Sequence, residues 1–369
     1  FGWLGEVIGE NISHPLLNSL IVDGIIAGAG GVVVFLPQIL ILFLFILILE
    51  ESGYLPRAAF LLDKLMFSAG LSGRAFIPLL SSFACAVPGI MATRSIADPR
   101  DRLTTIMVAP LMTCSARLPV YALLIAAFIP NQTVWGMFNL QGLVLFGLYM
   151  AGIVSALGVS FVLKFLQKDK SEHVLLMELP SYRFPDLKSV WIGLLDRAKI
   201  FLKRVGGIIF ALSILLWFLC TFPQPPEGAT MPAIDYSFAG MLGHVLQPIF
   251  APVGFNWQIV IALIPAMAAR EVVVAALGTV YALSAVDEDA MSQGLAALIS
   301  GGGELGWSLA TGLSLLVWFI YAPHCLATLA TVKRETGSWR TVSIMTCYLF
   351  GLAYFMSFLT YQTASYLLG

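Results

Sequence analysis

The sequence has little charge. Only 11% of its 369 residues are Asp, Glu, Lys or Arg, whereas 59% are hydrophobic and the mean hydropathy is +0.90. Because a soluble domain carries about 25% charged residues, this composition excludes an ordinary soluble fold and predicts an all-α polytopic membrane protein. The formal net charge is −1, so no basic excess favours nucleic acid as a partner.

The sequence also lacks catalytic and disulfide signatures. It contains no Walker A glycine loop, no His-Glu-x-x-His, no Gly-x-Ser-x-Gly and no Cys-x-x-Cys. We therefore expect neither enzyme activity nor a nucleotide site in this chain. Five cysteines are an odd number and lie in or beside apolar segments, which favours packing thiols or ligands over disulfides. The chain begins at Phe1, and we expect a further portion upstream of it in the natural protein.

Apolar runs of about 20 residues predict helices that span a membrane. We expect eight such segments, some of them broken or re-entrant: 32–50, 74–93, 103–129, 137–167, 200–222, 257–282, 305–332 and 340–366. Residues 1–30 are too polar to span, and they predict an interfacial amphipathic helix followed by a joint.

Basic residues predict the sidedness of the loops. They place the linker at 167–204 and the loop at 333–340 in the cytoplasm, whereas the 223–256 loop, which has no Lys or Arg, is expected outside. Because two full crossings between 223–256 and 333–340 would contradict this sidedness, we expect 257–282 to be re-entrant or broken.

Two halves of the chain, 31–166 and 205–369, share an order of motifs. Each half carries a proline, then an arginine inside an apolar segment, then Ala-Pro followed by a cysteine. These residues are Pro78, Arg94, Pro110 and Cys114 in the first half, and Pro265, Arg270, Pro323 and Cys325 in the second. Repeats of this kind are common in transporters, with the site at the repeat interface. Parallel and inverted arrangements of the halves both stay open.

The stretch from Ser81 to Arg94 is unusual for a spanning helix, because it holds Cys85 and a Pro88–Gly89 pair. We expect that pair to break the helix. Backbone groups freed in hydrocarbon persist only where protein or water surrounds them. Two interpretations stay open: Cys85 and the nearby carbonyls face a permeating solute, or the helix is kinked around a buried cysteine.

Soft or borderline metal ligands lie close to prolines in these apolar segments. They are Cys85, Met91, Met112, Cys114, His324 and Cys325. Thiolate, thioether and imidazole suit Fe, Zn and Cu better than hard cations. A single cysteine is more often a packing residue, but its recurrence in three proline-bent segments favours a metal path.

Charged residues within apolar segments cost about 2.5–3.5 kcal/mol on insertion scales and are therefore candidates for gating or ion pairing. They are Glu50, Glu51, Arg94, Arg117, Arg270 and Glu271. We expect Arg117 to pair with Glu50, Glu51 or Glu271, with direct contact to the solute as the alternative. For Arg94 we expect anchoring at the membrane surface.

Long stretches of the sequence resemble the bacterial ferrous-iron transport protein B family. The resemblance rests on Glu50–Phe60, Cys85–Arg94, Pro99–Thr104, Ala109–Leu118, Pro265–Glu271 and Tyr321–Cys325, running on to Glu335. It covers most of the chain. It implies two gate-type repeats, Fe(II) import across the bacterial inner membrane, and pore cysteines at the positions of Cys85 and Cys325.

The resemblance also implies a cytoplasmic GTP-binding domain at the N-terminus, which this chain does not contain, so that GTP and Mg(II) would act only through that domain. The implied partners are the lipid bilayer, this domain, small accessory proteins of the ferrous-iron system and further copies in a homo-oligomer. The alternatives are a gate-type carrier of a nucleoside and a transporter of another divalent metal such as Zn(II) or Mn(II).

Overall fold

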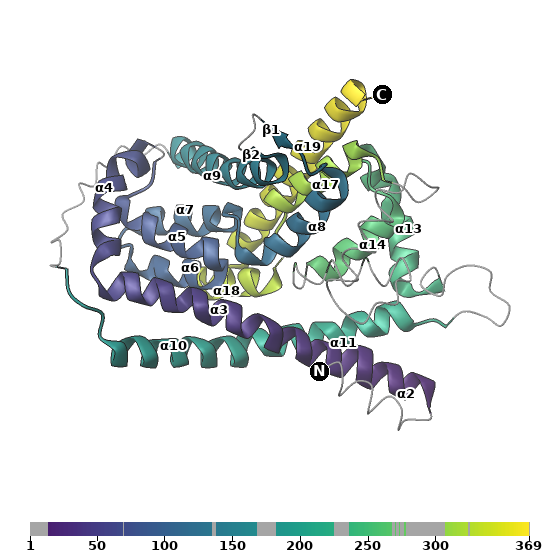
Figure 1. Ribbon diagram of the computed structural model, residues 1–369, viewed down its shortest axis with the longest axis horizontal. Coiled ribbons are helices and arrows are strands. Elements are labelled where there is room, and N and C mark those ends of the chain that lie inside the picture. The colour runs from purple at the N-terminus through teal and green to yellow at the C-terminus, as the bar shows by residue number, and fades with distance from the viewer. Residues whose placement is uncertain are drawn as a thin grey trace.

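A computed structural model describes residues 14–68, 70–134, 138–167, 182–224, 236–267, 270, 273, 277, 307–323 and 325–368. These residues are almost entirely helical (Figure 1), which confirms the all-α prediction. Two strands of two residues each, β1 (Thr133–Val134) and β2 (Phe138–Asn139), pair antiparallel.

The helices alternate between long rods and short broken pieces. In the first half they are α2 (Pro15–Ser19), the π-helix η1 (Leu20–Ile26), α3 (Ala27–Glu51), α4 (Tyr54–Ser68), η2 (Gly73–Ala75), α5 (Phe76–Ala84), α6 (Ala86–Ala92), η3 (Thr93–Ser95), α7 (Pro99–Val108), η4 (Ala109–Leu111), η5 (Ser115–Arg117), α8 (Leu118–Phe128) and α9 (Leu140–Gln167). In the second half they are α10 (Leu187–Phe201), the π-helix η6 (Leu202–Gly206), α11 (Gly207–Thr221), α13 (Phe238–Phe250), η7 (Ala251–Val253), α14 (Trp257–Ala266), α17 (Leu309–Tyr321), α18 (Leu326–Thr336) and α19 (Trp339–Leu368).

Side-chain caps fix several helix starts. Asp98 accepts hydrogen bonds from the backbone N–H groups of Arg100 and Asp101, at 2.7 and 3.4 Å, and Pro99 occupies the first position of α7. This is the start that an acidic cap followed by proline predicts. Ser237, Asn256 and Ser308 cap α13, α14 and α17 in the same way.

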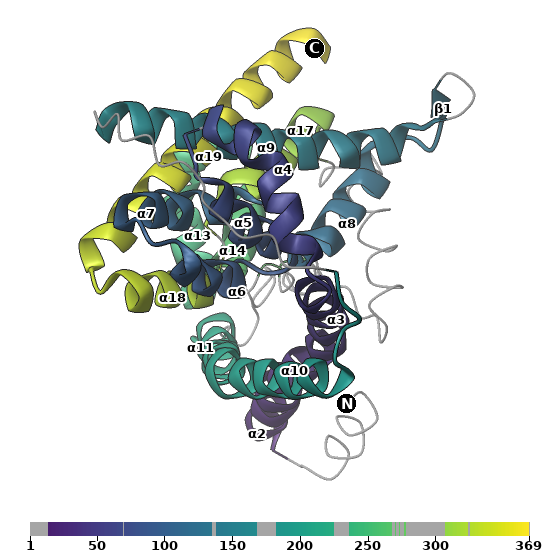
Figure 2. The ribbon, with the colours of Figure 1, turned by 90° about the vertical axis from the view of Figure 1, so that its left-hand side faces the viewer.

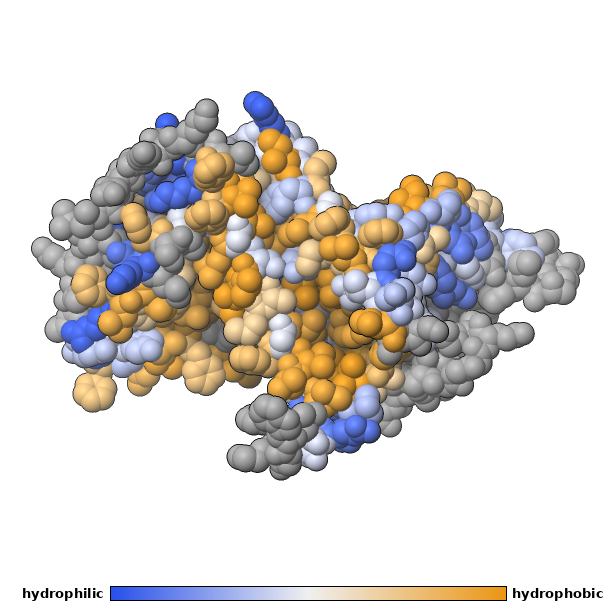
Figure 3. All heavy atoms as spheres, turned by 90° about the horizontal axis from the view of Figure 1, so that it is seen from above, coloured by the Kyte–Doolittle hydropathy of each residue, from blue (hydrophilic) through white to orange (hydrophobic). Residues whose placement is uncertain are grey.

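The long helices enclose a continuous apolar core. Buried side chains of α5 to α9 meet those of α14, α17 and α19, and α19 packs along α17. On one side of the molecule α10 and α11 run beside α3, with α9 and α17 on the opposite side (Figures 1 and 2). Hydrophobic side chains also cover much of the face seen in Figure 3, and many large ones are exposed among the described residues, as expected for a protein whose outside meets lipid.

Several stretches are long and apolar enough to cross a membrane. Among the described residues these are Pro99–Phe128, Leu140–Phe165 and Trp339–Leu367. A fourth, Phe238–Val253 with Trp257–Ala266, is bent by 102°. The chain is therefore a multi-pass membrane protein, and α9 and α19 lie where 137–167 and 340–366 predict helices.

Other predicted boundaries differ from the structure. The 223–256 stretch, predicted as a loop, contains α13, an apolar helix capped by Ser237. The lack of basic residues in this stretch bears on the side of the membrane where it lies and does not prevent a helix. The predicted linker at 167–204 contains α10, which packs on α3 and continues through η6 towards α11. Of the predicted segment 257–282, α14 covers the first part, and most of 268–282 lies outside the described residues.

Candidate functional site

Cys85 forms the tip of a helical hairpin. It is the single residue between α5 and α6, and its backbone is extended, with φ −157° and ψ 133°. The two helices fold back on each other so closely that a Cβ on Gly89 would lie 2.0 Å from Ser82 Oγ and 2.7 Å from the carbonyl oxygen of Pro78. At a rise of about 1.5 Å per residue, each leg is shorter than half of a bilayer core of about 30 Å. This is the geometry of a re-entrant hairpin.

The helix breaks at Cys85, and the prediction of a break at Pro88–Gly89 is wrong. Both residues lie inside α6. Pro88 sits in the first turn, where its missing N–H removes no helical hydrogen bond. Gly89 faces α5, and the close approach of that helix leaves no room for a side chain at this position.

Cys114 lies at a second break. After α7 and η4 the chain is extended at Met112 and again at Cys114, and η5 and α8 follow. The predicted segment 103–129 is therefore two helices with a central interruption. Ser115 Oγ donates a hydrogen bond of 3.0 Å to the carbonyl oxygen of Ala84, which ties this break to the hairpin tip at Cys85.

Cys325 lies at a third break. Helix α17 ends at Tyr321, Ala322 is extended, and Cys325, with φ −168° and ψ 100°, directly precedes α18. The backbone N–H of Leu326 donates to the carbonyl oxygen of Met267, the residue after α14, at 3.1 Å. Because α18 packs against α6, the helices that begin after Cys85 and Cys325 are neighbours.

The predicted metal ligands thus lie at or near breaks, but the structure does not gather them into a closed metal cage. In the described ranges no three His, Cys, Asp or Glu side chains are close enough together to hold a metal ion. All five cysteines lie within these ranges, and none of them forms a disulfide. Met91 is half-buried in α6, Met112 is buried, and His324 lies outside the described residues.

Arg117 is fully buried, and it bonds to backbone carbonyls. Its Nη2 donates to the carbonyl oxygen of Pro110 at 2.9 Å, and its Nη1 to those of Met112 at 3.1 Å and Leu111 at 3.4 Å. These are carbonyls that the break after α7 frees from helical bonding.

The predicted ion pair of Arg117 with Glu50 or Glu51 is therefore wrong. Those carboxylates lie at the end of α3, where Glu50 is 3.8 Å from Arg197 and Glu51 is 3.2 Å from Arg183. Both arginines belong to the 182–201 stretch, which packs on α3. Glu271, the third predicted partner, lies outside the described residues.

Arg270 makes a similar contact in the second half, although the order of motifs matches it with Arg94 rather than with Arg117. It is 5% exposed, and its Nη2 donates to the carbonyl oxygen of Ala322 at 3.1 Å, directly before Pro323. Each half of the chain therefore places a buried arginine on carbonyls next to its Ala-Pro sequence.

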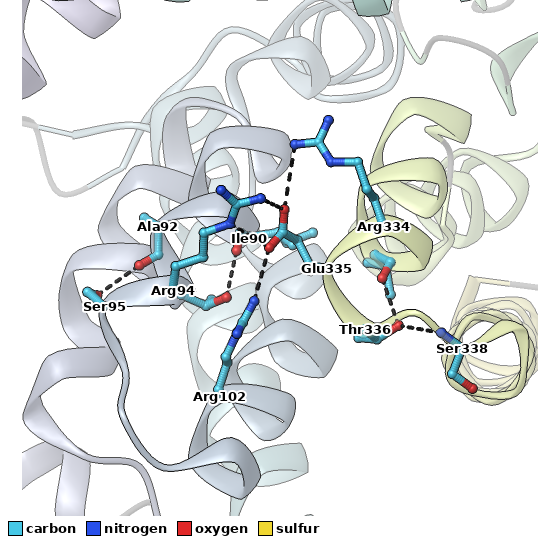
Figure 4. Close-up of polar contacts among 11 residues, drawn as sticks. Ile90, Ala92, Arg94, Ser95, Arg102, Arg334, Glu335, Thr336 and Ser338 are labelled. Atoms are coloured by element: carbon cyan, nitrogen blue, oxygen red, sulfur yellow. Dashed lines mark hydrogen bonds and ion pairs between the residues drawn. The ribbon is translucent and has the colours of Figure 1, made fainter.

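Arg94 does not simply anchor at the surface, because it binds Glu335 at the end of α18 (Figure 4). Its Nε and Nη2 donate to the two carboxylate oxygens at 2.8 and 2.7 Å. Arg102 lies 3.0 Å and Arg334 3.6 Å from the same carboxylate, which is 1% exposed. The hydrogen bond from Arg94, with the charges of the arginines, holds the pKa of Glu335 below its usual range.

Sequence reasoning did not single out Glu335 or Arg102. A signal was nevertheless present in the spacing: Arg94 follows Cys85 by the same nine positions by which Arg334 follows Cys325. Equal spacing from the two break cysteines places each arginine at the end of the helix that begins after its cysteine. Because these two helices pack together, both arginines lie close to Glu335.

Comparison with known proteins agrees with these features. A family model named Gate and described as "Nucleoside recognition" matches residues 32–128 and 202–339, and a model described as "Ferrous iron transport protein B C terminus" matches residues 145–197. The Fe(2+) transporter FeoB of Leptospira biflexa is 44% identical over 97% of this chain and 53% of its own length. That of Campylobacter jejuni is 37% identical over 100% of this chain and 59% of its own length. No solved structure matches.

A further relative is named as a fusion of two proteins. The Fe(2+) transport protein A/Fe(2+) transporter FeoB fusion protein of Porphyromonas gingivalis is 38% identical over 98% of this chain and 46% of its own length. The chain thus spans about half the length of these relatives.

The long apolar helices, the re-entrant hairpin and the paired breaks define a multi-pass membrane protein of the gate type. Its two halves supply matching breaks, each with a cysteine and a buried arginine. The chain belongs to the ferrous iron transport protein B family.

Proposed function

We propose that this chain is the permease portion of a ferrous-iron importer in the bacterial inner membrane. The observation that carries the proposal is that Cys85, Cys114 and Cys325 each lie at the break of an apolar helix. The first two breaks are linked by the hydrogen bond from Ser115 to Ala84, and the helices that follow Cys85 and Cys325 pack together. Thiols bind Fe(II) in preference to hard cations, and a transient site needs ligands that release the ion again. Relatives that match nearly the whole chain are named Fe(2+) transporters.

The two gate repeats, 31–166 and 205–369, would flank the ion path, with the linker at 167–204 in the cytoplasm and residues 1–30 at the membrane interface. Support for two related repeats comes from the break cysteine that follows Ala-Pro in each half, Cys114 and Cys325. The buried arginines differ in order, because Arg117 follows its Ala-Pro sequence and Arg270 precedes its own. A GTP-binding domain in the remainder of the natural protein would control the path, with GTP and Mg(II) acting there. The fusion relative supports a small accessory protein as a partner; self-association is a further proposal.

Anaerobic uptake into liposomes tests the proposal, with radioactive Fe(II) as the ion and Zn(II), Mn(II) and uridine as competitors. We expect Fe(II) uptake by wild-type protein, and its loss in Cys85→Ser and Cys325→Ser. Cys347→Ser is the matched control, because Cys347 is exposed on α19 and lies at no break. Full iron uptake by both break variants would contradict the ligand assignment, and uridine transport without metal transport would contradict the function.

The role of the GTP-binding domain is tested in the same assay. Iron flux through this chain alone would make it an open path that the domain regulates. Flux that appears only when the GTP-binding domain is added would mean that opening requires the soluble partner. Comparison of the two preparations at equal protein density in the liposomes separates these outcomes.

A further inference from the structure

Several carbonyl oxygens next to the helix breaks are bonded to protein donors. At the hairpin tip, the carbonyl oxygen of Ala84 accepts from Ser115 Oγ, and beside Cys325 that of Met267 accepts from the backbone N–H of Leu326. Arg117 occupies the carbonyls of Pro110 to Met112, and Arg270 that of Ala322. Unwound carbonyls in other transporters coordinate the hard cations that those proteins carry.

A hydrogen bond alone does not exclude a cation, because a carbonyl oxygen has a second lone pair. A guanidinium bound to the oxygen adds its positive charge at that atom, and this charge weakens the binding of any cation through the same oxygen, since like charges repel strongly where little water screens them. Arg117 is 0% exposed and Arg270 is 5% exposed, so both charges act at close range on the carbonyls that they bind. The carbonyls of Pro110 to Met112 and of Ala322 are therefore poor cation ligands.

We propose that Arg117 and Arg270 set the metal selectivity of the permeation path by withholding these carbonyls from the ion. This inference rests on the proposed function. Ca²⁺ takes six to eight oxygen ligands, and Mg²⁺ also prefers oxygen, so both lose the ligands that an unwound helix normally offers. Fe²⁺ accepts sulfur, and the cysteine of each break follows the arginine-bound carbonyls along the chain. The two arginines are positioning residues, because they act on the ion through the backbone.

The experiment measures anaerobic uptake of Fe²⁺ and Ca²⁺ by the full-length protein in liposomes. We expect Arg117→Gln to raise the Ca²⁺-to-Fe²⁺ uptake ratio by about tenfold, which corresponds to about 1.4 kcal/mol. Arg117→Lys keeps the charge with fewer donors, and we expect a ratio nearer to that of the wild type. Arg340→Gln is the control, because it removes an exposed arginine at the start of α19 and leaves the ratio unchanged.

A folded Arg117→Gln protein that keeps the wild-type ratio would overturn the proposal. Should Arg117→Gln fail to fold, Arg270→Gln is measured in its place, since it removes the charge beside the Ala322 carbonyl. A folded Arg270→Gln protein with the wild-type ratio would likewise overturn the proposal. Should neither variant fold, inhibition of Fe²⁺ uptake by other cations is measured on the wild-type protein. We expect thiophilic Cd²⁺ to block Fe²⁺ uptake. Inhibition by a large excess of Ca²⁺ would contradict the inference. Wild-type protein that carries no Fe²⁺ would count against the proposed function itself, since the inference concerns only the ratio between ions.

Discussion

Arg94 and Glu335 join the two halves of the molecule through a two-point ion pair, with N–O distances of 2.8 and 2.7 Å. Arg94 follows the hairpin helix α6, and Glu335 ends α18. These helices pack side by side, and each begins directly after a break cysteine. A movement that separates the two cysteines by spreading the helices would therefore strain or break this pair at their other ends.

Removal of the carboxylate in Glu335→Gln should destabilise the protein, because Arg94, Arg102 and Arg334 would lose their shared counter-charge. We expect a loss of about 1.5–3 kcal/mol, the range for hydrogen bonds to charged groups, nearer the lower value because the arginines are partly exposed. Thermal unfolding in detergent measures the change. Asp196→Asn is the control, an exposed acid on α10, and an equal shift in both variants would contradict the role of Glu335.

Acid should abolish the difference between wild-type protein and Glu335→Gln. The bond from Arg94 lowers the pKa of Glu335 in the folded state, so its stabilisation is complete above the unfolded pKa of about 4.3. That stabilisation is lost as the pH falls through the lower, folded pKa. We expect the two melting temperatures to differ at pH 7 and to converge below pH of about 4. A difference that persists unchanged at the lowest pH would contradict the assignment.

The sequence predicts the class of this fold well, because hydropathy directly reflects the lipid solvent. Helices α9 and α19 match their apolar runs closely. The site of the first break is less predictable, since local propensity points to Pro88–Gly89 and tertiary packing places it at Cys85. Gly89 allows the close contact with Ser82 and Pro78 and does not form the break itself. A contact between two helices cannot be predicted from the sequence of either helix alone.

The charged residues show the same limit. Hydropathy correctly marks Arg117 as a residue that needs partners, but it suggests carboxylates, whereas the structure supplies the carbonyls of Pro110 to Met112. Glu335 lies beside Lys333 and Arg334 in sequence and therefore looks neutralised locally. Its principal partner, Arg94, comes from the other half of the chain, and only the fold reveals that pairing.

Gly89→Ala should open the α5–α6 hairpin. The new methyl group would lie 2.0 Å from Ser82 Oγ and 2.7 Å from the carbonyl oxygen of Pro78, and that carbonyl is backbone that cannot rotate away. Overpacking of this kind costs about 1–3 kcal/mol, and displacement of the tip would also lower iron uptake. Gly147→Ala on α9 is the control, because nothing lies within 4 Å of its added Cβ. Equal melting temperatures and uptake for both variants would show that the close approach is unimportant.

Ser115→Ala should loosen the link between the breaks at Cys85 and Cys114. Ser115 Oγ is 3.0 Å from the carbonyl oxygen of Ala84, and its removal leaves a break carbonyl without that donor, at a cost of about 0.5–1.5 kcal/mol. Because the serine hydroxyl carries no positive charge, and a hydrogen bond alone leaves the second lone pair of this oxygen open, we expect the competition between Ca²⁺ and Fe²⁺ for uptake to stay that of the wild type. Ser115→Thr keeps a hydroxyl and should restore stability, which thermal unfolding in detergent measures. Equal melting temperatures for Ser115→Ala and the wild type would contradict the structural role of this hydrogen bond, and a gain in Ca²⁺ competition would show that a neutral donor also affects ion choice.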